Sequence, residues 1–238
     1  MMKTQLFCVP YAGGTTDLYN ELEAYLSEDI ELVRIEYAGH GKRLEEPFYD
    51  SFQDMVSDAK RMIMERMDPT SENAFLGYSM GSLVVYEVLR QWEQTDVSHV
   101  FLSAHKPPHL RNAAQRYALA SNDNGDIKSW LMEFGGIDDR LKHSRIFWEM
   151  YGPIFQKDYE LMRDYELPDT RNAVAAAATF FYSEEDTPLT EMKQWDRYFL
   201  KECRFQRYSG NHFFIREHAK EMAYRINTAI KCSTGGKI

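Results

Sequence analysis

The residues best suited to covalent chemistry lie in the segment GYSMG at residues 77–81. This segment ends the short apolar run 74–77 and precedes the run 82–91, which has helical spacing. A serine between two glycines, placed where a strand turns into a helix, is typical of a nucleophile elbow. The turn leaves no room for side chains two residues before and two after the serine. We therefore predict Ser79 to be the nucleophile of a covalent hydrolase; the alternative is a tight turn whose serine only caps the helix.

A serine hydroxyl attacks at useful rates only when a base removes its proton and a carboxylate orients that base. In proteins with such an elbow the chain order is serine, acid, histidine, and the histidine lies between the last strand and the last helix. His212, in the segment SGNHFF at residues 209–214, meets that condition. We predict it to be the base, the alternative being a surface-loop histidine. His40 precedes the serine in the chain and is interpreted as a site-lining or turn residue.

The acid should follow a strand that lies between the serine and the histidine in the chain. The loop after the predicted strand 100–103 holds no carboxylate before the helical region begins. Glu184, Glu185 and Asp186 come directly after the predicted strand 173–182. We predict Asp186 to be the acid. The two glutamates are its immediate rivals, and the alternative for all three is a solvated acidic loop.

Hydrolysis by a serine also needs two backbone N–H groups that face the oxyanion formed on the attacked carbonyl. The first is expected from Met80, at the N-terminus of the helix after the elbow. The second is expected from the loop after the first strand, PYAGG at residues 10–14, with Ala12 as the donor. Adjacent glycines let a backbone approach a substrate closely. As a phosphate-binding loop this segment is a weak candidate, because no lysine follows in the P-loop pattern.

Neither a metal site nor a cofactor is predicted. His105 and His109 are four residues apart, but Pro107 and Pro108 break the helix that would place both rings on one face. The three cysteines are an odd number, lie far apart and lack metal-type spacing. We therefore expect neither a disulfide framework nor a zinc site.

Strand-like and helix-like periods alternate along most of the chain. The expected strands cover residues 5–9, 30–35, 74–77, 100–103, 173–182 and 204–208. The expected helices cover residues 18–26, 52–63, 82–91, 191–199 and 215–230. This succession predicts one α/β domain over residues 1–238, with a mostly parallel sheet flanked by helices on both faces. The alternation stops over residues 105–171, where helix-like segments at 127–134 and 146–165 predict an inserted helical lid.

The formal net charge of −9, from 28 basic and 37 acidic residues, argues against a large basic surface. We therefore do not expect nucleic acid or an anionic membrane as a partner. Two local basic pairs, Lys42 with Arg43 and Arg111 with Arg116, are interpreted as ordinary surface pairs. The sequence lacks a run of about 20 apolar residues that could span a membrane, and its first residues lack the apolar stretch of a signal peptide. A soluble, cytoplasmic monomer is expected.

An ordered set of short segments runs nearly from end to end of the chain. They are PYAGG at 10–14, GHGKR at 39–43, GYSMG at 77–81, KPPH at 106–109, MRDY at 162–165, ED at 185–186, Trp195 and GNHFF at 210–214. Together they resemble the motifs of the type II thioesterases of nonribosomal peptide and polyketide assembly lines, which are stand-alone α/β-hydrolases. The resemblance implies an α/β-hydrolase fold and a triad of Ser79, Asp186 and His212. It also places the oxyanion amides at Met80 and in the Ala12 loop.

The resemblance further implies a substrate and a partner. Members of this family hydrolyse acyl or aminoacyl groups stranded on the phosphopantetheine arm of a carrier protein, which restores a blocked assembly line. A thioester makes few demands on the catalytic groups of an active site. Its leaving group is a thiol with a pKa of about 8.5, which needs little help from a general acid. Two alternatives stay open: a general carboxylesterase or lipase acting on small esters, and a non-catalytic α/β-hydrolase used as a binding module.

Two positions depart from the pattern of this family. The family usually has histidine where this chain has Tyr78, and proline where it has Ala38. Neither residue is expected to transfer a proton in the reaction. Effects on packing or acyl selection are therefore expected rather than loss of the reaction. A group of lid aromatics could line a channel for the arm, although such residues are more often core: Trp130, Phe134, Phe147, Trp148, Tyr151 and Phe155.

Overall fold

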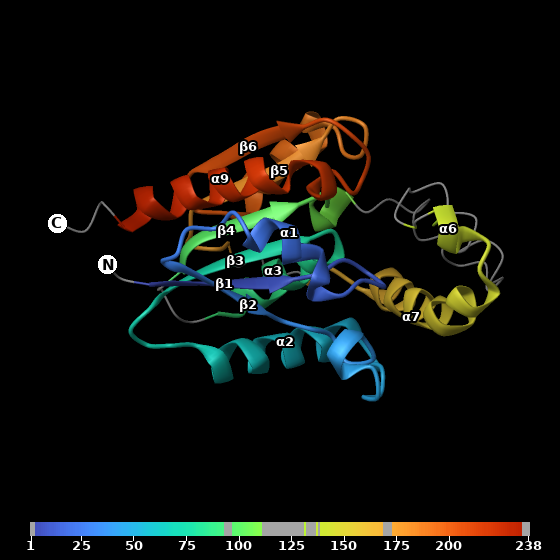
Figure 1. The fold of residues 1–238 in the computed structure, drawn as a ribbon. Helices are drawn as coiled ribbons and strands as arrows, with labels where there is room; N and C mark the ends of the chain where they lie inside the picture. Colours follow the sequence, from blue (N-terminus) through green and yellow to red (C-terminus); the bar gives the residue numbers. More distant parts are fainter. Residues whose placement is uncertain are drawn as a thin grey trace.

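A sheet of parallel strands organises the molecule. The computed structural model describes residues 3–92, 97–110, 131, 137, 139–168 and 173–234. Within them six strands pair in the order β2-β1-β3-β4-β5-β6, and every pair is parallel (Figure 1). The strands are β1 (Thr4–Val9), β2 (Ile30–Arg34), β3 (Glu72–Tyr78), β4 (Val97–Ser103), β5 (Ala178–Ser183) and β6 (Cys203–Tyr208).

All six predicted strands are present, but one begins later than predicted. The small and apolar run 173–182 predicted a strand that starts at residue 173, whereas β5 starts at Ala178. Val174 forms only an isolated parallel bridge with Phe199. Alanine fills residues 175–178. Because alanine is depleted in strands, the apolar run could not mark where the strand begins.

Helices cover both faces of the sheet. The α-helices are α1 (Asn20–Glu23), α2 (Phe52–Arg66), α3 (Met80–Arg90), α6 (Asp139–Lys142), α7 (Arg145–Asp164), α8 (Leu189–Met192) and α9 (Ile215–Thr234). The short 3₁₀ helices are η1 (Thr16–Tyr19), η2 (Gly41–Arg43), η3 (Pro108–Leu110) and η4 (Lys193–Tyr198). The predicted helix 191–199 is thus divided into α8 and η4, and the predicted helix 18–26 into η1 and α1.

The side chains of each inner strand alternate between two separate hydrophobic cores, one on each face of the sheet. In β1, Phe7 and Val9 belong to the core under α2 and α3, whereas Leu6 and Cys8 belong to the core under α1 and α9. Successive side chains of a strand point to opposite faces, so a strand covered on both faces is apolar throughout. Figure 1 shows α2 and α9 on opposite sides of the sheet. The predicted arrangement of a parallel sheet between two helical layers is confirmed.

Helix α7 lies beyond the edge of the sheet where the strands end (Figure 1). The predicted helix 146–165 corresponds to α7 with its bounds shifted by one residue. The predicted helix 127–134 falls outside the described residues except for Leu131. The limits of the lid, 105–171, and the assignment of residues 1–238 to one domain stay predictions.

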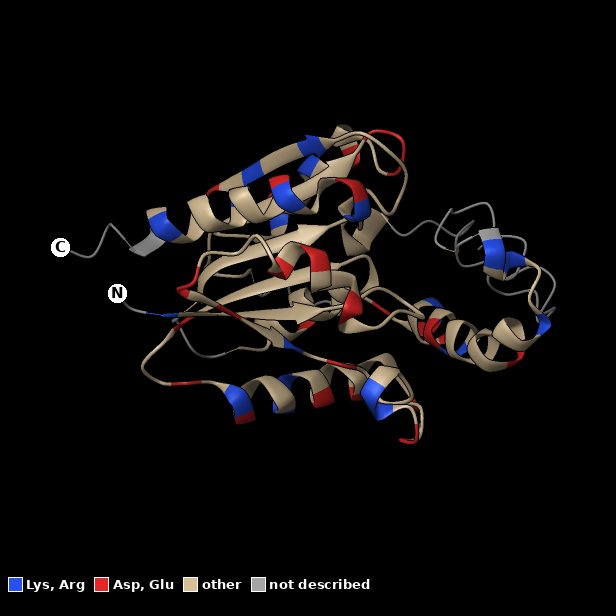
Figure 2. Cartoon of the chain, viewed as in Figure 1, with Lys and Arg blue, Asp and Glu red and all other residues tan. Residues whose placement is uncertain are grey.

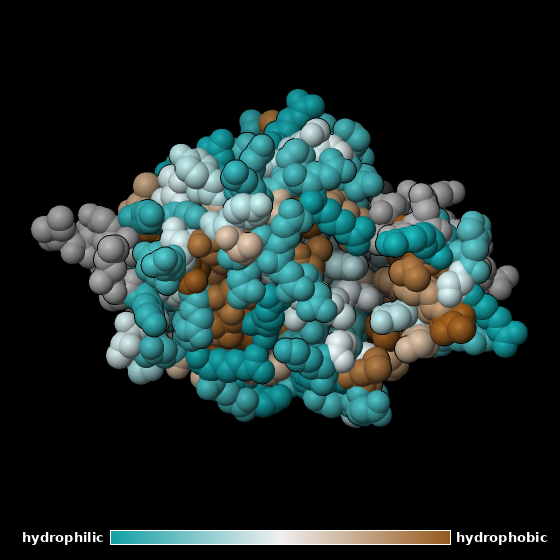
Figure 3. Space-filling view, viewed as in Figure 1, coloured by the Kyte–Doolittle hydropathy of each residue, from teal (hydrophilic) through white to brown (hydrophobic). Residues whose placement is uncertain are grey.

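The surface combines mixed charge with an apolar side. Figure 2 shows Lys and Arg interleaved with Asp and Glu along α2 and α9, and Arg61 with Glu65 is one such pair at 2.8 Å. Figure 3 shows hydrophobic residues in two places, near the middle of this face and on the side that carries α6 and α7. The large exposed apolar residues of these two helices are Leu141, Ile146, Met150 and Tyr151. In the described ranges, no helix is both long and apolar enough to cross a bilayer.

Candidate active site

Ser79 lies on a strained turn between β3 and α3. Its backbone has φ 53° and ψ −119°, and a positive φ is uncommon for residues other than glycine. A Cβ on Gly77 would lie 2.4 Å from the carbonyl oxygen of Gly81, and a Cβ on Gly81 would lie 2.1 Å from that of Val9. Both contacts are with backbone atoms, so neither position can hold a side chain. The turn presents Ser79 at the carboxyl edge of the sheet, where the elbow motif predicts it.

Side chains from three loops meet at this edge. His212 Nε2 lies 2.9 Å from Ser79 Oγ, and His212 Nδ1 lies 2.8 Å from Asp186 Oδ1. Ser79 follows β3, Asp186 follows β5, and His212 lies between β6 and α9. The side chains of His212 and Asp186 are 9% and 8% exposed, so water competes little for these hydrogen bonds. When Nδ1–H donates to Asp186, Nε2 is left to accept the serine hydroxyl.

The structure separates Asp186 from its glutamate rivals. The Asp186 carboxylate reaches the imidazole of His212. Glu185 Oε1 instead accepts a hydrogen bond of 3.3 Å from the backbone N–H of Gly210, and Glu184 is exposed. The carboxylate favoured by the sequence is therefore the one in contact with the histidine, while Glu185 helps to hold the loop that carries it.

Tyr78 supports the loop that carries His212. Its side chain is fully buried, and its hydroxyl donates to the backbone carbonyl oxygen of His212 at 2.6 Å. The ring also meets the imidazole edge-on, with centroids 6.1 Å apart. Tyr78 does not line the pocket over Ser79 within the described residues. Of the two effects expected for this departure from the family pattern, the contacts favour packing over acyl selection.

The loop after β1 reaches the pocket over Ser79. Ala12 lines the same pocket as Ser79, and Met80 opens α3 directly after the nucleophile. The neighbouring Gly13 N–H is engaged elsewhere, because it donates to Asp158 Oδ2 at 2.6 Å. In the part of the chain that the structure describes, the N–H groups of Ala12 and Met80 have no acceptor. Neither amide is therefore engaged by another group there, and the role of both as oxyanion donors stays a prediction.

His40 does not line the pocket, contrary to one interpretation of its position in the sequence. It is 1% exposed, and its Nε2 lies 2.9 Å from Asp158 Oδ2 in α7. Burial lowers the pKa of this imidazole, but the hydrogen bond and the charge of Asp158 outweigh burial and raise the pKa above its ordinary value. The lid motif at 162–165 contains a different acid, Asp164, which is exposed and pairs with Arg163.

Asp158 was not predicted to contact the body of the protein, although the sequence carried a signal for such a contact. The residues Ile154, Phe155, Leu161 and Met162 are buried along one face of α7. Asp158 lies four residues after Ile154 and four before Met162, so it falls on that same face. A carboxylate inside an apolar stripe needs a partner, because an unpaired buried charge is very costly. Such a position predicts a specific polar contact between the helix and the body of the protein.

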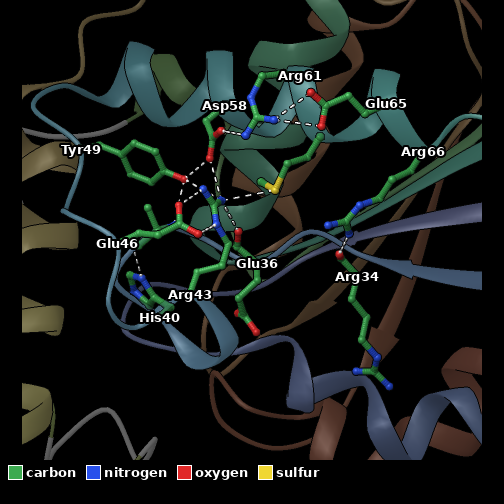
Figure 4. A network of polar contacts seen from close by, with 12 residues as sticks. Arg34, Glu36, His40, Arg43, Glu46, Tyr49, Asp58, Arg61, Glu65 and Arg66 are labelled. Carbon is green, nitrogen blue, oxygen red and sulfur yellow. Dashed lines mark hydrogen bonds and ion pairs between the residues drawn. The ribbon is translucent and has the colours of Figure 1, made fainter.

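Arg43, at the end of the GHGKR motif, holds the loop after β2 against α2. Its guanidinium donates to Glu46 at 2.8 Å and to Asp58 at 2.7 Å (Figure 4). Tyr49 donates to the same Asp58 oxygen at 2.6 Å and accepts the N–H of Ala38 at 3.0 Å. Burial raises the pKa of Asp58, but the hydrogen bonds from Tyr49 and Arg43 outweigh burial and lower it. The prediction of an ordinary surface pair is therefore wrong for Arg43, which is half-buried in a network.

The same network accounts for alanine at position 38. A proline there would have no N–H to donate to Tyr49. Alanine keeps that hydrogen bond of 3.0 Å, and its carbonyl oxygen lies 2.9 Å from His40 Nδ1. Ala38 therefore connects the Arg43 network to His40 through its two backbone polar groups.

A pocket of about 340 Å³, which includes its open mouth, lies over Ser79 and His212. The other lining residues are largely apolar: Tyr11, Ala12, Leu131, Ile137, Phe155, Tyr159 and Phe213. Among the predicted lid aromatics, Phe155 thus lines the pocket, whereas Phe147 and Trp148 pack against the core. Trp130 and Phe134 lie outside the described residues. Apolar walls with a few convergent polar groups are typical of a site for a small organic substrate.

His105 and His109 do not converge on a common point. His105 Nδ1 lies 2.6 Å from the carbonyl oxygen of Lys106. His109 instead contacts Gln194 at 3.0 Å and the Tyr198 hydroxyl at 2.8 Å. Within the described ranges, no group of three or more His, Cys, Asp or Glu residues could hold a metal ion.

A parallel sheet between helical layers, with a serine elbow after its third strand and a serine–histidine–aspartate contact at its carboxyl edge, defines an α/β-hydrolase. The chain belongs to the thioesterase domain family, whose family model matches residues 4–230. It is thus a hydrolase that acts on thioester bonds, as the resemblance of its motifs implied.

Individual relatives are distant but cover most of the chain. The chain is 26% identical over 227 residues to the gramicidin S biosynthesis protein GrsT of Aneurinibacillus migulanus, covering 92% of this chain and 86% of that protein. It is 24% identical over 235 residues to the medium-chain S-acyl fatty acid synthase thioesterase of Homo sapiens, covering 96% and 86%. Among solved structures, ClbQ from the colibactin NRPS/PKS pathway matches its fold with a TM-score of 0.89 at 21% identity, covering 98% of each chain.

Proposed function

We propose that this protein is a serine thioesterase that removes acyl or aminoacyl groups from the phosphopantetheine arm of carrier proteins and so clears blocked nonribosomal peptide or polyketide assembly lines. The contact of Ser79 with His212, and of His212 with Asp186, carries the proposal. The similarity to GrsT, named for gramicidin S biosynthesis, and to ClbQ, from an NRPS/PKS pathway, supports the choice of a carrier-bound substrate.

In the first half-reaction Ser79 attacks the thioester carbonyl. His212 Nε2, 2.9 Å from Ser79 Oγ, takes the hydroxyl proton as the new C–O bond forms. Negative charge develops on the carbonyl oxygen, which the N–H groups of Ala12 and Met80 stabilise. When the tetrahedral intermediate collapses, the C–S bond breaks and the thiol leaves with the proton that His212 held. The acyl group stays on Ser79 as an ester.

In the second half-reaction water takes the place of the thiol. His212 removes a proton from the water molecule as it attacks the acyl-enzyme carbonyl. The C–O bond to Ser79 then breaks, the serine regains its proton from His212, and the free acid leaves. Asp186, bound to Nδ1 at 2.8 Å, keeps the imidazole in the required tautomer and stabilises its cationic form in both half-reactions.

The pocket supports an acyl group as the moiety that is held over Ser79. Its walls include Phe155 and Tyr159 from α7 and Phe213 from the loop after β6. Burial of apolar acyl carbons against such walls is favourable, at roughly 25 cal/mol per Å² removed from water. The proposed reaction needs no cofactor. The partner is a carrier-protein domain, and the monomeric state and cytoplasmic location expected from the sequence stay predictions.

The proposal is tested with a carrier protein that bears an acyl group on its phosphopantetheine arm. Release of the free acid should fall by about 10⁴-fold or more in Ser79→Ala, because the nucleophile is lost. Ser57→Ala, at an exposed position on α2, is the matched control and should keep the wild-type rate. Undiminished release by a correctly folded Ser79→Ala protein would reject the proposal.

The same assay decides the substrate class when a matched small ester is compared with the carrier-bound thioester. A higher kcat/KM for the carrier-bound thioester supports the proposal. A preference for the free ester would instead identify a general carboxylesterase. If wild-type protein releases no acid and a fluorophosphonate probe does not label Ser79, the protein is a non-catalytic binding module.

A further inference from the structure

One carboxylate joins the helix over the pocket to the loop that faces the reacting carbonyl. Asp158 Oδ2, on α7, accepts the backbone N–H of Gly13 at 2.6 Å. The same oxygen lies 2.9 Å from His40 Nε2. The side chains of Asp158 and His40 are each 1% exposed, so both contacts are shielded from water. Two segments 145 residues apart in the chain, at Gly13 and Asp158, are thereby tied at a single atom.

The geometry around His40 fixes its orientation and favours its charged form. Its Nδ1 lies 2.9 Å from the carbonyl oxygen of Ala38, and its Nε2 faces the carboxylate of Asp158. The carbonyl oxygen is an acceptor, and so is the carboxylate oxygen when Asp158 is ionised, so the ring makes both hydrogen bonds when each of its nitrogens carries a proton. In that state the ring is an imidazolium ion held at two ends, and the raised pKa of His40 favours this state. The ring then gives Asp158 a charged donor, and charge-assisted hydrogen bonds are about twice as strong as neutral ones.

The loop after β1 depends on the hydrogen bond from Gly13 to Asp158, because the loop contains glycines whose backbone can adopt many conformations. Gly13 has φ +72°, and a Cβ there would lie 1.9 Å from Cδ1 of Phe155 in α7. Glycine at this position is demanded by the close packing of α7, but glycine also lets a peptide unit rotate at low cost. The hydrogen bond to Asp158 removes that freedom, since it fixes the direction of the Gly13 N–H. The peptide plane between Ala12 and Gly13 is then fixed. The preceding plane, which carries the Ala12 N–H, is joined to it at the Cα of Ala12 and is also held by the bond of 3.1 Å from the Gly14 N–H to the Tyr11 carbonyl oxygen.

We infer that Asp158 and His40 are positioning residues for the thioesterase reaction, which hold the loop after β1 so that the Ala12 N–H faces the developing oxyanion. This inference rests on the proposed role of Ala12 and of Ser79. Asp158 acts through the Gly13 amide, and His40 acts through Asp158; neither side chain touches the substrate. The pair also makes the catalytic geometry depend on where α7 lies, because the acceptor belongs to that helix.

The test compares Asp158→Leu with Asp158→Asn, using hydrolysis of a butyryl-pantetheine thioester. Leucine has no acceptor for Gly13, so kcat should fall by about 10–100-fold, part of the roughly 10²–10³-fold effect of losing an oxyanion donor. KM should change by less than about threefold, because the pocket walls are unaltered. Asparagine can place its amide oxygen where Asp158 Oδ2 lies and there accept both the Gly13 N–H and the N–H of His40 Nε2, so it should restore most of the lost kcat.

Asp164→Leu is the matched control, six residues further along the same helix at an exposed position. Its kcat should equal that of wild type. The inference is overturned if Asp158→Leu keeps kcat within threefold of Asp164→Leu, or if asparagine restores nothing. If Asp158→Leu does not fold, His40→Leu takes its place, and an unchanged kcat in that variant overturns the inference. Absence of hydrolysis by wild-type protein would instead reject the proposed function, so the two failures are distinct.

Discussion

Tyr78, directly before the nucleophile, allows a test of how the histidine loop is held. Its hydroxyl donates to the carbonyl oxygen of His212 at 2.6 Å and accepts a longer bond of 3.4 Å from the N–H of Ile215. The side chain is fully buried beneath the elbow. Replacement of Tyr78 by phenylalanine removes one oxygen atom and these two hydrogen bonds, while the ring keeps its place.

The size of the effect follows from burial. Loss of a hydrogen-bond partner from a buried polar group costs about 1–3 kcal/mol. For a chain of 238 residues, each kcal/mol lowers Tm by roughly 2–4 °C, so Tyr78→Phe should lower Tm by about 2–12 °C. Because the lost bond anchors the residue that carries the imidazole, kcat should also fall, by about tenfold, which corresponds to about 1.4 kcal/mol of transition-state stabilisation.

Tyr208→Phe is the matched control for this change. Tyr208 is 5% exposed, and its buried hydroxyl has no hydrogen-bond partner among the described residues. Its ring stacks on Phe214, which also contacts the ring of Tyr78, so both tyrosines belong to one aromatic cluster. Thermal unfolding and steady-state kinetics on both variants measure the difference. If Tyr78→Phe is as stable and as active as Tyr208→Phe, the hydroxyl does not hold the loop and the reasoning is refuted.

Two further predictions concern the acid and a buried histidine. Asp186→Asn should lower kcat for thioester hydrolysis on the order of 10⁴-fold, because the amide favours the wrong tautomer of His212; Glu185→Gln should have little effect, and equal losses in the two variants would contradict the assignment of the acid. Burial, helped by the charge of Arg204, lowers the pKa of His99 to about 4 from 6.5. The stability gained from neutral His99 is therefore complete above about pH 6.5 and is lost as pH falls toward 4, so urea unfolding should show the stability difference between wild type and His99→Gln shrinking by about 3 kcal/mol over that range. A difference that does not change with pH would show that His99 does not titrate in this way.

The fold was predictable where its physical cause is local. Runs of strand length between helix-like segments predicted all six strands. The inner strands are largely apolar because both faces of the sheet are covered, whereas the edge strands β2 and β6 keep polar residues among their apolar ones. The start of β5 was not predictable, since alanine at residues 175–178 fits helix, strand or loop. The order of the strands in the sheet was not predicted either, because pairing depends on contacts between segments far apart in the chain.

In the candidate site, too, the features with a local cause were predictable from the sequence, whereas contacts between distant segments were not. The spacing of Gly77, Ser79 and Gly81 predicted the elbow, since only a backbone that bends this sharply excludes side chains at both flanking positions. The order of serine, acid and histidine along the chain then predicted His212 to be the base. Asp186 was predicted ahead of Glu184 and Glu185, and the contact of its carboxylate with the imidazole separates it from these two neighbours in three dimensions.

The residues that the sequence analysis misjudged are those whose environment is set by distant segments. His40 and Arg43 have polar side chains in a segment with two glycines, a pattern typical of a surface turn. The burial of His40 and the half-burial of Arg43 come from contacts with α7 and α2, which lie elsewhere in the chain. Asp158 stands among charged neighbours in the segment QKDYE, so local composition hid it. Only its place on the apolar face of the helix distinguishes it from Asp164.

The bond between Asp158 and Gly13 bears on any attempt to re-engineer this enzyme for a different acyl group. Helix α7 supplies Phe155 and Tyr159 to the pocket wall, which makes it the natural segment to exchange with that of a relative. The exchange would also replace the acceptor on which the first loop rests. A chimera should therefore retain aspartate or asparagine at position 158 together with His40, because selectivity and turnover share this one helix and cannot be altered as separate modules.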